Sequence, residues 1–191
     1  GLIAQIKAAP PYRPTSFEMS ELESARKAAV LWLMYPNLEG EIEGVLIERA
    51  EYDGVHSKQV GMPGGEMELS DTDYIDTALR ECREELGIAV HRGNVLGALS
   101  PLYIPPSNFY VRPYVAWLHN CPVWSPDEGE VSNVLRCKMS YISDPETWKS
   151  YEVKGMQVPG FLLESRLVWG ATAMMIAELM ECWKLPDTFA E

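Results

Sequence analysis

Residues 61–88 read GMPGGEMELSDTDYIDTALRECREELGI, and this stretch decides how the surrounding chain folds. Its pattern predicts a short strand, a glycine turn, a loop and a helix, in that order. Gly64 and Gly65 let the turn adopt backbone conformations that a Cβ atom forbids, and let it lie close to a ligand. Gly87 is placed to end the helix, as a C-terminal glycine does.

Three glutamates of this helix, Glu81, Glu84 and Glu85, lie away from its apolar stripe. The stripe consists of residues spaced three and four apart, namely Ile75, Ala78, Leu79, Cys82 and Leu86. Residues three or four apart are neighbours on a helix surface, so the glutamates repel one another unless a cation joins them. Carboxylate oxygens suit Mg²⁺ and Mn²⁺. The helix taken alone is compatible with a metal site and with a solvated acidic face.

The turn and the helix together resemble the Nudix box. Its second half has the order Arg-Glu-aliphatic-any-Glu-Glu-any-Gly-aliphatic, and residues 80–88, RECREELGI, match it with Cys82 at the aliphatic position. The first half is one residue longer than the general box and lacks the glutamate expected in its middle. A longer box with Glu68, Asp71 and Asp73 in these places resembles that of the coenzyme A pyrophosphatase branch of the Nudix hydrolases.

Segments on both sides of the box extend this resemblance over roughly residues 27–180. Upstream, Arg49 and the run HSKQVGMPGG at 56–65 resemble an arginine followed by His-x-Gly-Gln and Phe-Pro-Gly-Gly, with Lys58 and Met62 as departures. The downstream segments that are similar to bacterial members are YIPPSNF at 103–109 and VWGATAM at 168–174.

The resemblance implies hydrolysis of a nucleoside diphosphate derivative by water, with Mg²⁺ or Mn²⁺ as the cofactor. It implies that the side chains of Glu81 and Glu85 and the carbonyl oxygen of Gly65 bind the metal. Glu84 is a further ligand or the general base. Arg80 is expected to orient these carboxylates rather than to contact the substrate. A base from a loop is the alternative, and its candidates are Glu128 and Glu130.

With coenzyme A as the substrate, the products would be 4′-phosphopantetheine and adenosine 3′,5′-bisphosphate, and the 3′-phosphate needs cationic partners. The available donors are Arg49, His56, Lys58 and Arg112. Guanidinium groups suit bidentate phosphate recognition. Each donor also has a structural interpretation, because an arginine can pair with a neighbouring acid, a histidine can hydrogen-bond its own loop, and a lysine can be a surface charge.

The 191-residue chain is acidic, with 28 acidic and 16 basic residues and a net charge of −12. This balance argues against general nucleic-acid binding, which depends on Lys and Arg. No apolar run approaches the ~18 residues of a membrane span, and no signal peptide is evident. The four cysteines lack zinc-site spacing, so we expect free thiols and a cytoplasmic location. The expected partner is a small nucleotide substrate, and the oligomeric state, a homodimer included, stays open.

The rest of the chain alternates apolar runs with helical patterns, which predicts an α+β fold, an α/β/α sandwich with a mixed sheet packed between helices. We expect residues 1–26 to form an N-terminal arm and residues 27–191 the Nudix hydrolase domain. Residues 169–184 predict a second amphipathic helix. The runs that predict strands are 27–35, 45–49, 59–62, 95–103, 109–118, 131–140 and 158–168.

Other functions remain open at this point. A pocket re-shaped by Lys58 and Met62 would favour ADP-ribose, NADH or a nucleoside triphosphate as the substrate. A nucleotide-sensing Nudix domain without turnover is another candidate, although the metal-binding half of the box is intact. The acidic charge balance argues against an RNA-decapping role.

Overall fold

The computed structural model describes residues 1–14, 17–50 and 59–183. His56 and Lys58, two of the predicted substrate-binding residues, lie outside the described residues. The α-helices are α1 (Leu2–Lys7), α2 (Met19–Ser24), α3 (Tyr74–Leu86), α4 (Met139–Ser143) and α5 (Gly170–Trp183). The strands are β1 (Arg26–Pro36), β2 (Ile42–Arg49), β3 (Val60–Gly61), β4 (Gly64–Glu66), β5 (Val95–Ala98), β6 (Leu102–Ile104), β7 (Phe109–Trp117), β8 (Val131–Lys138), β9 (Lys149–Val153), β10 (Met156–Leu163) and β11 (Arg166–Trp169).

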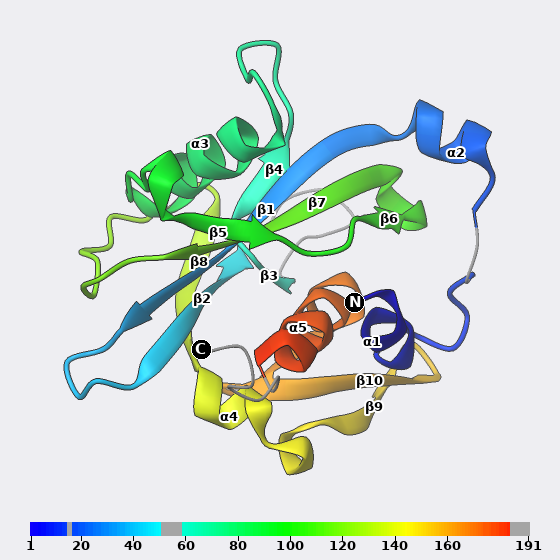
Figure 1. Cartoon of the computed structure of the whole chain (residues 1–191). Coiled ribbons are helices and arrows are strands. Elements are labelled where there is room, and N and C mark those ends of the chain that lie inside the picture. Colours follow the sequence, from blue (N-terminus) through cyan, green and yellow to red (C-terminus); the bar gives the residue numbers. More distant parts are fainter. Residues whose placement is uncertain (15–16, 51–58, 184–191) are drawn as a thin grey trace, which may run out of the picture.

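A mixed sheet of eight strands forms the centre of the molecule (Figure 1). Its hydrogen-bonded order is β3-β2-β1-β7-β5, while β4 pairs with β1, β6 with β7, and β8 with β2. β1 and β7 run parallel, and the other pairs run antiparallel. The parallel β1–β7 pair beside the antiparallel β1–β2 hairpin confirms the expected mixed sheet. β1 is buried on both faces along most of its length, which explains its nearly continuous apolar sequence.

Alternate residues of β1 enter two separate apolar clusters, because successive side chains of a strand point to opposite faces. Those on one face join Ala78 and Leu86 of α3, and those on the other join Met175 and Ile176 of α5. The β1 residues of the first cluster are Ala29, Leu31, Leu33 and Tyr35, and those of the second are Ala28, Trp32 and Met34. Figure 1 shows α3 and α5 on opposite sides of the sheet, which confirms the α/β/α sandwich.

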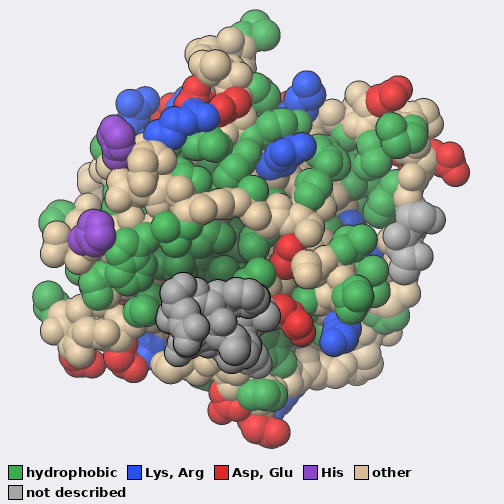
Figure 2. Space-filling view, in the orientation of Figure 1, with side chains coloured by type: hydrophobic (Ala, Val, Ile, Leu, Met, Phe, Trp, Pro, Cys, Tyr) green, Lys and Arg blue, Asp and Glu red, His purple; other side chains and the backbone are tan. Residues whose placement is uncertain are grey.

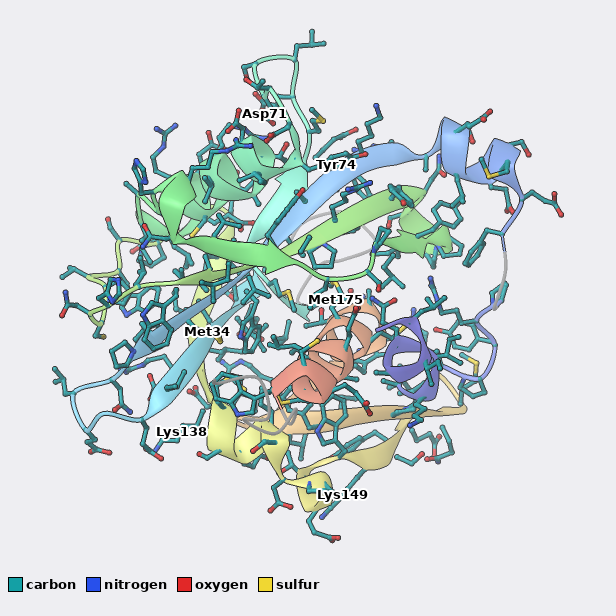
Figure 3. All side chains as sticks on the ribbon, viewed as in Figure 1. Met34, Asp71, Tyr74, Lys138, Lys149 and Met175 are labelled. Carbon is teal, nitrogen blue, oxygen red and sulfur yellow. The ribbon has the colours of Figure 1, made fainter. Side chains whose placement is uncertain are left out.

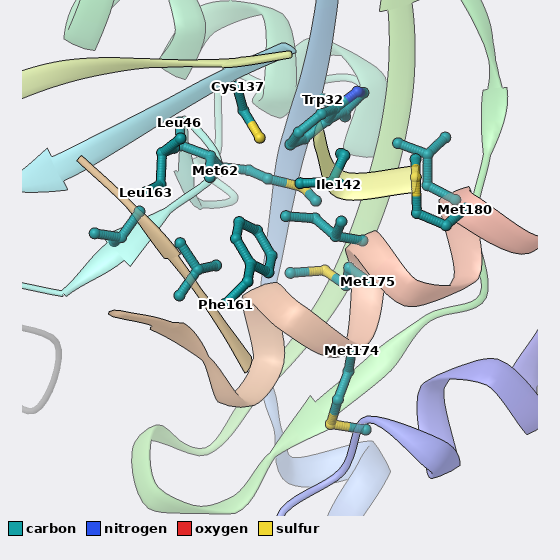
Figure 4. Close-up of a cluster of buried hydrophobic side chains, with 14 of the residues drawn as sticks. Trp32, Leu46, Met62, Cys137, Ile142, Phe161, Leu163, Met174, Met175 and Met180 are labelled. Atoms are coloured by element: carbon teal, nitrogen blue, oxygen red, sulfur yellow. The ribbon is translucent and has the colours of Figure 1, made fainter. Parts of the chain in front are cut away.

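A second, antiparallel sheet with the order β9-β10-β11 lies on the far side of α5. Its Phe161 packs beside Met175 of α5 (Figure 4). The run 158–168, expected to hold one strand, contains parts of two, because β10 and β11 are joined by a tight turn at Glu164 and Ser165 with φ of 49° and 67°. Such a turn usually carries glycine or asparagine, so the sequence lacked the signal for it.

Two further segments differ in detail from the expected pattern. The run 95–103 forms two short strands, β5 and β6, which are separated by residues 99–101 with Pro101 last. Within the expected arm, α1 lies against α5, where Gln5 donates a hydrogen bond of 2.7 Å to Glu178. No helix of the described residues has the length and apolarity needed to cross a membrane.

Candidate active site

The glycine turn between β3 and β4 brings backbone against a carboxylate of α3. Gly64 has a φ of 150°, and a Cβ atom on it would lie 2.3 Å from the carbonyl oxygen of Ala29 in β1. A Cβ atom on Gly65 would lie 2.4 Å from Oε1 of Glu81. Glycine therefore leaves room for the Glu81 carboxylate beside the backbone of β4.

Glu85 is the buried carboxylate of this region, with none of its side chain exposed. Its Oε2 accepts a hydrogen bond of 2.7 Å from the backbone N–H of Gly64, and its Oε1 lies 3.0 Å from Nη1 of Arg49. Burial raises the pKa of Glu85 to about 7, although Arg49 and the Gly64 N–H favour its ionised form. Oε1 is close to Arg49 as an ion pair but accepts no hydrogen bond of good geometry from the described residues. This buried oxygen therefore keeps an electron pair for another partner.

Arg80 links the carboxylates of the helix to the loop before it. Its Nε and Nη2 donate to the two oxygens of Asp71, at 3.0 Å each. Nη1 donates to Glu81 at 2.9 Å and to Glu84 at 2.8 Å. Nη2 also donates to the carbonyl oxygen of Glu66 at 2.9 Å. These bonds occupy the guanidinium with protein acceptors, the arrangement expected of a residue that orients carboxylates.

Two aspartates of the loop have roles that the sequence pattern did not assign. Asp71 accepts a hydrogen bond from the hydroxyl of Thr77 at 3.0 Å, and its bonds with Arg80 hold its pKa at about 2. Asp73 caps α3, because its Oδ1 accepts from two backbone N–H groups of the first turn. Figure 3 shows Asp71 beside α3. The extra residue of the box was the sequence signal that pointed to this loop.

The loop between β7 and β8 contains the two acids named as alternative bases. Burial is the main cause of the raised pKa of Glu81 and Glu85, and the charge of Glu130 adds a smaller repulsion to both. Glu130 is therefore within electrostatic reach of the two carboxylates. The side chain of Glu128 is exposed and forms no hydrogen bond or ion pair with a described residue. The side chain of Glu130 is likewise exposed and without a hydrogen bond or ion pair to a described residue, so both acids stay candidates for the base.

The two predicted substrate-binding arginines that the structure describes differ in their surroundings. Arg49 connects the glycine turn to α3. Its Nη2 donates to the carbonyl oxygen of Gly64 at 2.5 Å, and its Nη1 forms an ion pair with Glu85. Arg112, on β7, is exposed, and its guanidinium lies 5.2 Å from the ring centre of Tyr74 at the start of α3. Arg112 is therefore more accessible to an anion than Arg49 is.

The donor set matches the chemistry of a magnesium or manganese ion. Glu81, Glu85 and the Gly65 carbonyl group offer oxygen donors only, which these ions prefer. Oε1 of Glu85, which accepts no hydrogen bond from the described residues, has the electron pair that a cation would take. In the described part of the chain, no group of three or more His, Cys, Asp or Glu side chains is arranged as a metal-binding cluster. Mg²⁺ needs no such cluster, since one or two carboxylates usually hold it together with water and substrate phosphates.

Comparisons with known proteins identify the family of this chain. Residues 25–151 match the family model of the NUDIX domain. A Yersinia pestis (strain Pestoides F) protein, named as the uncharacterized Nudix hydrolase NudL, is 32% identical over 161 residues, which cover 82% of this chain and 79% of the relative.

Solved structures show the same fold at low sequence identity. A MutT/nudix family protein from Enterococcus faecalis has a TM-score of 0.60 at 15% identity, over 87% of this chain and 62% of that one. A MutT protein from Methanosarcina mazei Go1 has a TM-score of 0.55 at 14% identity, over 85% of this chain and 99% of that one. From the family match and its carboxylate-bearing box, the chain belongs to the NUDIX family and is a Nudix hydrolase, a diphosphatase that acts on nucleoside diphosphate derivatives.

Proposed function

We propose that this chain hydrolyses the diphosphate of coenzyme A or its derivatives, releasing 4′-phosphopantetheine and adenosine 3′,5′-bisphosphate. The observation that supports hydrolysis is the buried carboxylate of Glu85 beside the glycine turn, whose Oε1 accepts no hydrogen bond. The choice of coenzyme A rests on the longer box and on the flanking segments that resemble coenzyme A pyrophosphatases. The longer loop holds Asp71, which binds Arg80 through two hydrogen bonds.

Nudix hydrolases generally need divalent metal ions, and we propose Mg²⁺ or Mn²⁺ here. Such an ion would neutralise diphosphate charge and lower the pKa of the attacking water. Glu81, Glu85 and the Gly65 carbonyl oxygen would hold it, with Glu84 as a further candidate. Arg80 would keep Glu81 and Glu84 oriented through its hydrogen bonds of 2.9 and 2.8 Å.

Arg112 is the best-placed described cation for the 3′-phosphate. Ala29 of β1 pairs with Gly65 on one side and with Arg112 on the other. Neighbouring strands lie about 4.8 Å apart, so the backbone of Arg112 is roughly 10 Å from the glycine turn. The Arg112 side chain is exposed and makes no ion pair with a described acid. His56 and Lys58 are proposed as further partners of the same phosphate.

The test is a panel assay that follows phosphate products from coenzyme A, dephospho-coenzyme A, ADP-ribose, NADH and a nucleoside triphosphate. We expect turnover of coenzyme A with Mg²⁺ or Mn²⁺, release of the two named products, and no turnover in EDTA. Preference for coenzyme A over its dephospho form is expected in the wild type, and Arg112→Gln should reduce it by raising KM for coenzyme A alone.

Equal turnover of the two forms would contradict the 3′-phosphate subsite. Turnover of ADP-ribose, NADH or a triphosphate in place of coenzyme A would establish the runner-up substrate class. Hydrolysis below detection across the panel, together with tight nucleotide binding by calorimetry, would instead identify a sensor.

We also propose a cytoplasmic setting for this activity. All four cysteines are free, and Cys82 and Cys137 are buried. Free thiols suit a reducing compartment. Light scattering on the purified chain would decide whether it forms a homodimer.

A further inference from the structure

Lys27 and Arg112 lie on the same face of the central sheet, on the neighbouring strands β1 and β7. In the parallel pairing of these strands, Ala29 lies opposite Arg112. Ala29 belongs to the apolar cluster that α3 covers. Lys27 precedes Ala29 by two residues, and residues two apart on a strand share a face, so both cations are on the α3 side. Strand spacing and rise put their Cα atoms roughly 8 Å apart, so the two long side chains can reach one anion.

Both cations are exposed and have no acidic partner in the described part of the chain. Lys27 forms no ion pair or side-chain hydrogen bond with a described residue. The guanidinium of Arg112 lies against the ring of Tyr74 and pairs with no described acid. Arg26, the neighbour of Lys27, points to the other face of the sheet and donates to Glu66 at 2.9 Å. In a chain with a net charge of −12, two adjacent cations without acids keep their charge for a ligand.

Tyr74 connects these two cations to the carboxylates of the box. Glu81 follows Tyr74 by seven residues and Glu85 follows Glu81 by four, which is about two turns and then one turn of helix. All three side chains therefore lie on one side of α3. The ring of Tyr74, and the guanidinium of Arg112 against it, are about 10 Å along the helix axis from Glu81. An anion bound by the two cations would lie on the same side of α3 as these carboxylates.

We propose that Lys27 is a phosphate-binding residue, which together with Arg112 holds a phosphate monoester of the substrate, and that Tyr74 is a positioning residue that acts through Arg112. This inference rests on the proposed function, in which that group is the 3′-phosphate of coenzyme A. A phosphate monoester carries close to two negative charges at neutral pH, so it suits two cations better than one. The ammonium group is a compact point charge and the guanidinium is a planar fork, so they suit different oxygens of one phosphate.

The first test measures kcat and KM of Lys27→Gln on coenzyme A and on dephospho-coenzyme A. We expect KM for coenzyme A to rise about 10-fold, as for loss of a hydrogen bond to a charged group, with kcat unchanged. KM for the dephospho form should keep its wild-type value, because that ligand lacks the 3′-phosphate. Lys27→Arg keeps the charge and should retain most of the affinity for coenzyme A.

Lys149→Gln is the matched control for the loss of one exposed lysine. Lys149 lies on β9 of the second sheet, and Figure 3 shows it at the opposite end of the molecule from Tyr74. Both KM values should stay at the wild-type level in this variant. A rise in KM for coenzyme A as large as that of Lys27→Gln would mean that net charge alone causes the effect.

The second test separates the positioning role of Tyr74 from a structural one. Tyr74→Leu removes the ring beside Arg112 and should raise KM for coenzyme A alone, by roughly 2–5-fold, the usual strength of an exposed cation–π contact. Tyr74→Phe keeps the ring and should behave as the wild type. If Tyr74 acts through Arg112, adding Tyr74→Leu to Arg112→Gln should cause little further rise in KM. Multiplicative effects, or a loss in Tyr74→Phe equal to that in Tyr74→Leu, would remove this role.

Calorimetry with adenosine 3′,5′-bisphosphate and 5′-AMP tests the phosphate site without turnover. We expect the wild type to bind the bisphosphate more tightly than 5′-AMP, and Lys27→Gln to weaken binding of the bisphosphate alone. If the wild type shows this preference but does not hydrolyse coenzyme A, the proposed function fails and the phosphate site is retained. Equal weakening of both nucleotides in Lys27→Gln, or no preference in the wild type, would overturn the role of Lys27 even if coenzyme A is the substrate.

Discussion

The two faces of the central sheet are covered by helices that are held in different ways. On the α3 side, arginines and carboxylates form a network around Arg80, and Figure 2 shows charged side chains of both signs gathered over this helix. On the α5 side, methionine and aromatic side chains pack into an apolar cluster (Figure 4). Burial of apolar surface stabilises a fold in proportion to the area buried. The attraction between buried charges does little more than offset the cost of removing them from water. Both faces of the sheet bury an apolar cluster, and only the α3 face adds this charged network, so we infer that the chemistry lies on the α3 side.

Each helix also buries one glutamate, and these two residues sharpen the contrast. Glu178 of α5 accepts hydrogen bonds from the backbone N–H and the hydroxyl of Ser100, and from Gln5 at 2.7 Å. Glu85 of α3 keeps one oxygen without a hydrogen-bond donor among the described residues. A satisfied buried carboxylate is typical of a structural element, and an unsatisfied one is typical of a binding site.

The largest expected effect is on stability, at the centre of the α5 side. Phe161→Ala removes a fully buried ring from the cluster and should lower the free energy of unfolding by about 3–5 kcal/mol. Urea unfolding measures this loss. The kcat of the folded fraction should stay near the wild-type value. A large fall in kcat would contradict the inference that the chemistry lies on the α3 side.

A comparable effect on activity is expected from Glu85→Gln. The amide keeps the shape of the side chain and can still accept from Gly64, but it removes the negative charge of the carboxylate. Turnover should fall by more than the roughly 10–100-fold that loss of an outer-shell partner costs. Mn²⁺ binding by calorimetry should weaken in parallel. Near-wild-type hydrolysis in this variant would contradict the metal-ligand assignment.

Glu178→Gln is the matched change on the other face. Replacing the carboxylate weakens charge-assisted hydrogen bonds to Ser100 and sets two amide groups against each other at Gln5. We expect a loss of roughly 1.5–3 kcal/mol in unfolding free energy, as for hydrogen bonds to charged groups, and unchanged kcat. If turnover fell as much as with Glu85→Gln, the two buried glutamates would not be distinguished by their hydrogen bonding.

The smallest of these effects depends on pH. Asp71 has a folded-state pKa of about 2, below its unfolded value, because Arg80 and Thr77 bond its ionised form. Its contribution, about 2 kcal/mol, is therefore fully present above pH 4 and is lost as the pH falls toward 2. Urea unfolding between pH 2.5 and 7 should show a steeper acid slope for the wild type than for Asp71→Asn. Parallel slopes would mean that the Asp71–Arg80 pair contributes little to stability.

Local sequence pattern predicted much of the fold correctly. The spacing of apolar residues located the two long helices, and the apolar runs located most strands of the central sheet. The prediction was wrong where the turn signal was missing, as at Glu164 and Ser165, which adopt positive φ without glycine. It was also silent on α1, a helix of six residues whose position depends on contact with α5. Elements this short are decided by packing more than by propensity.

The sequence by itself determined the family and the residue types of the site, because helical spacing and the glycine turn are local properties of the chain. It placed Glu81, Glu84 and Glu85 on one helix next to Gly65. Only the tertiary structure decided their surroundings, namely which carboxylate is buried and which of its oxygens accepts no hydrogen bond. These properties depend on contacts between elements far apart in sequence, such as Arg49 with Glu85, and no local periodicity encodes such contacts.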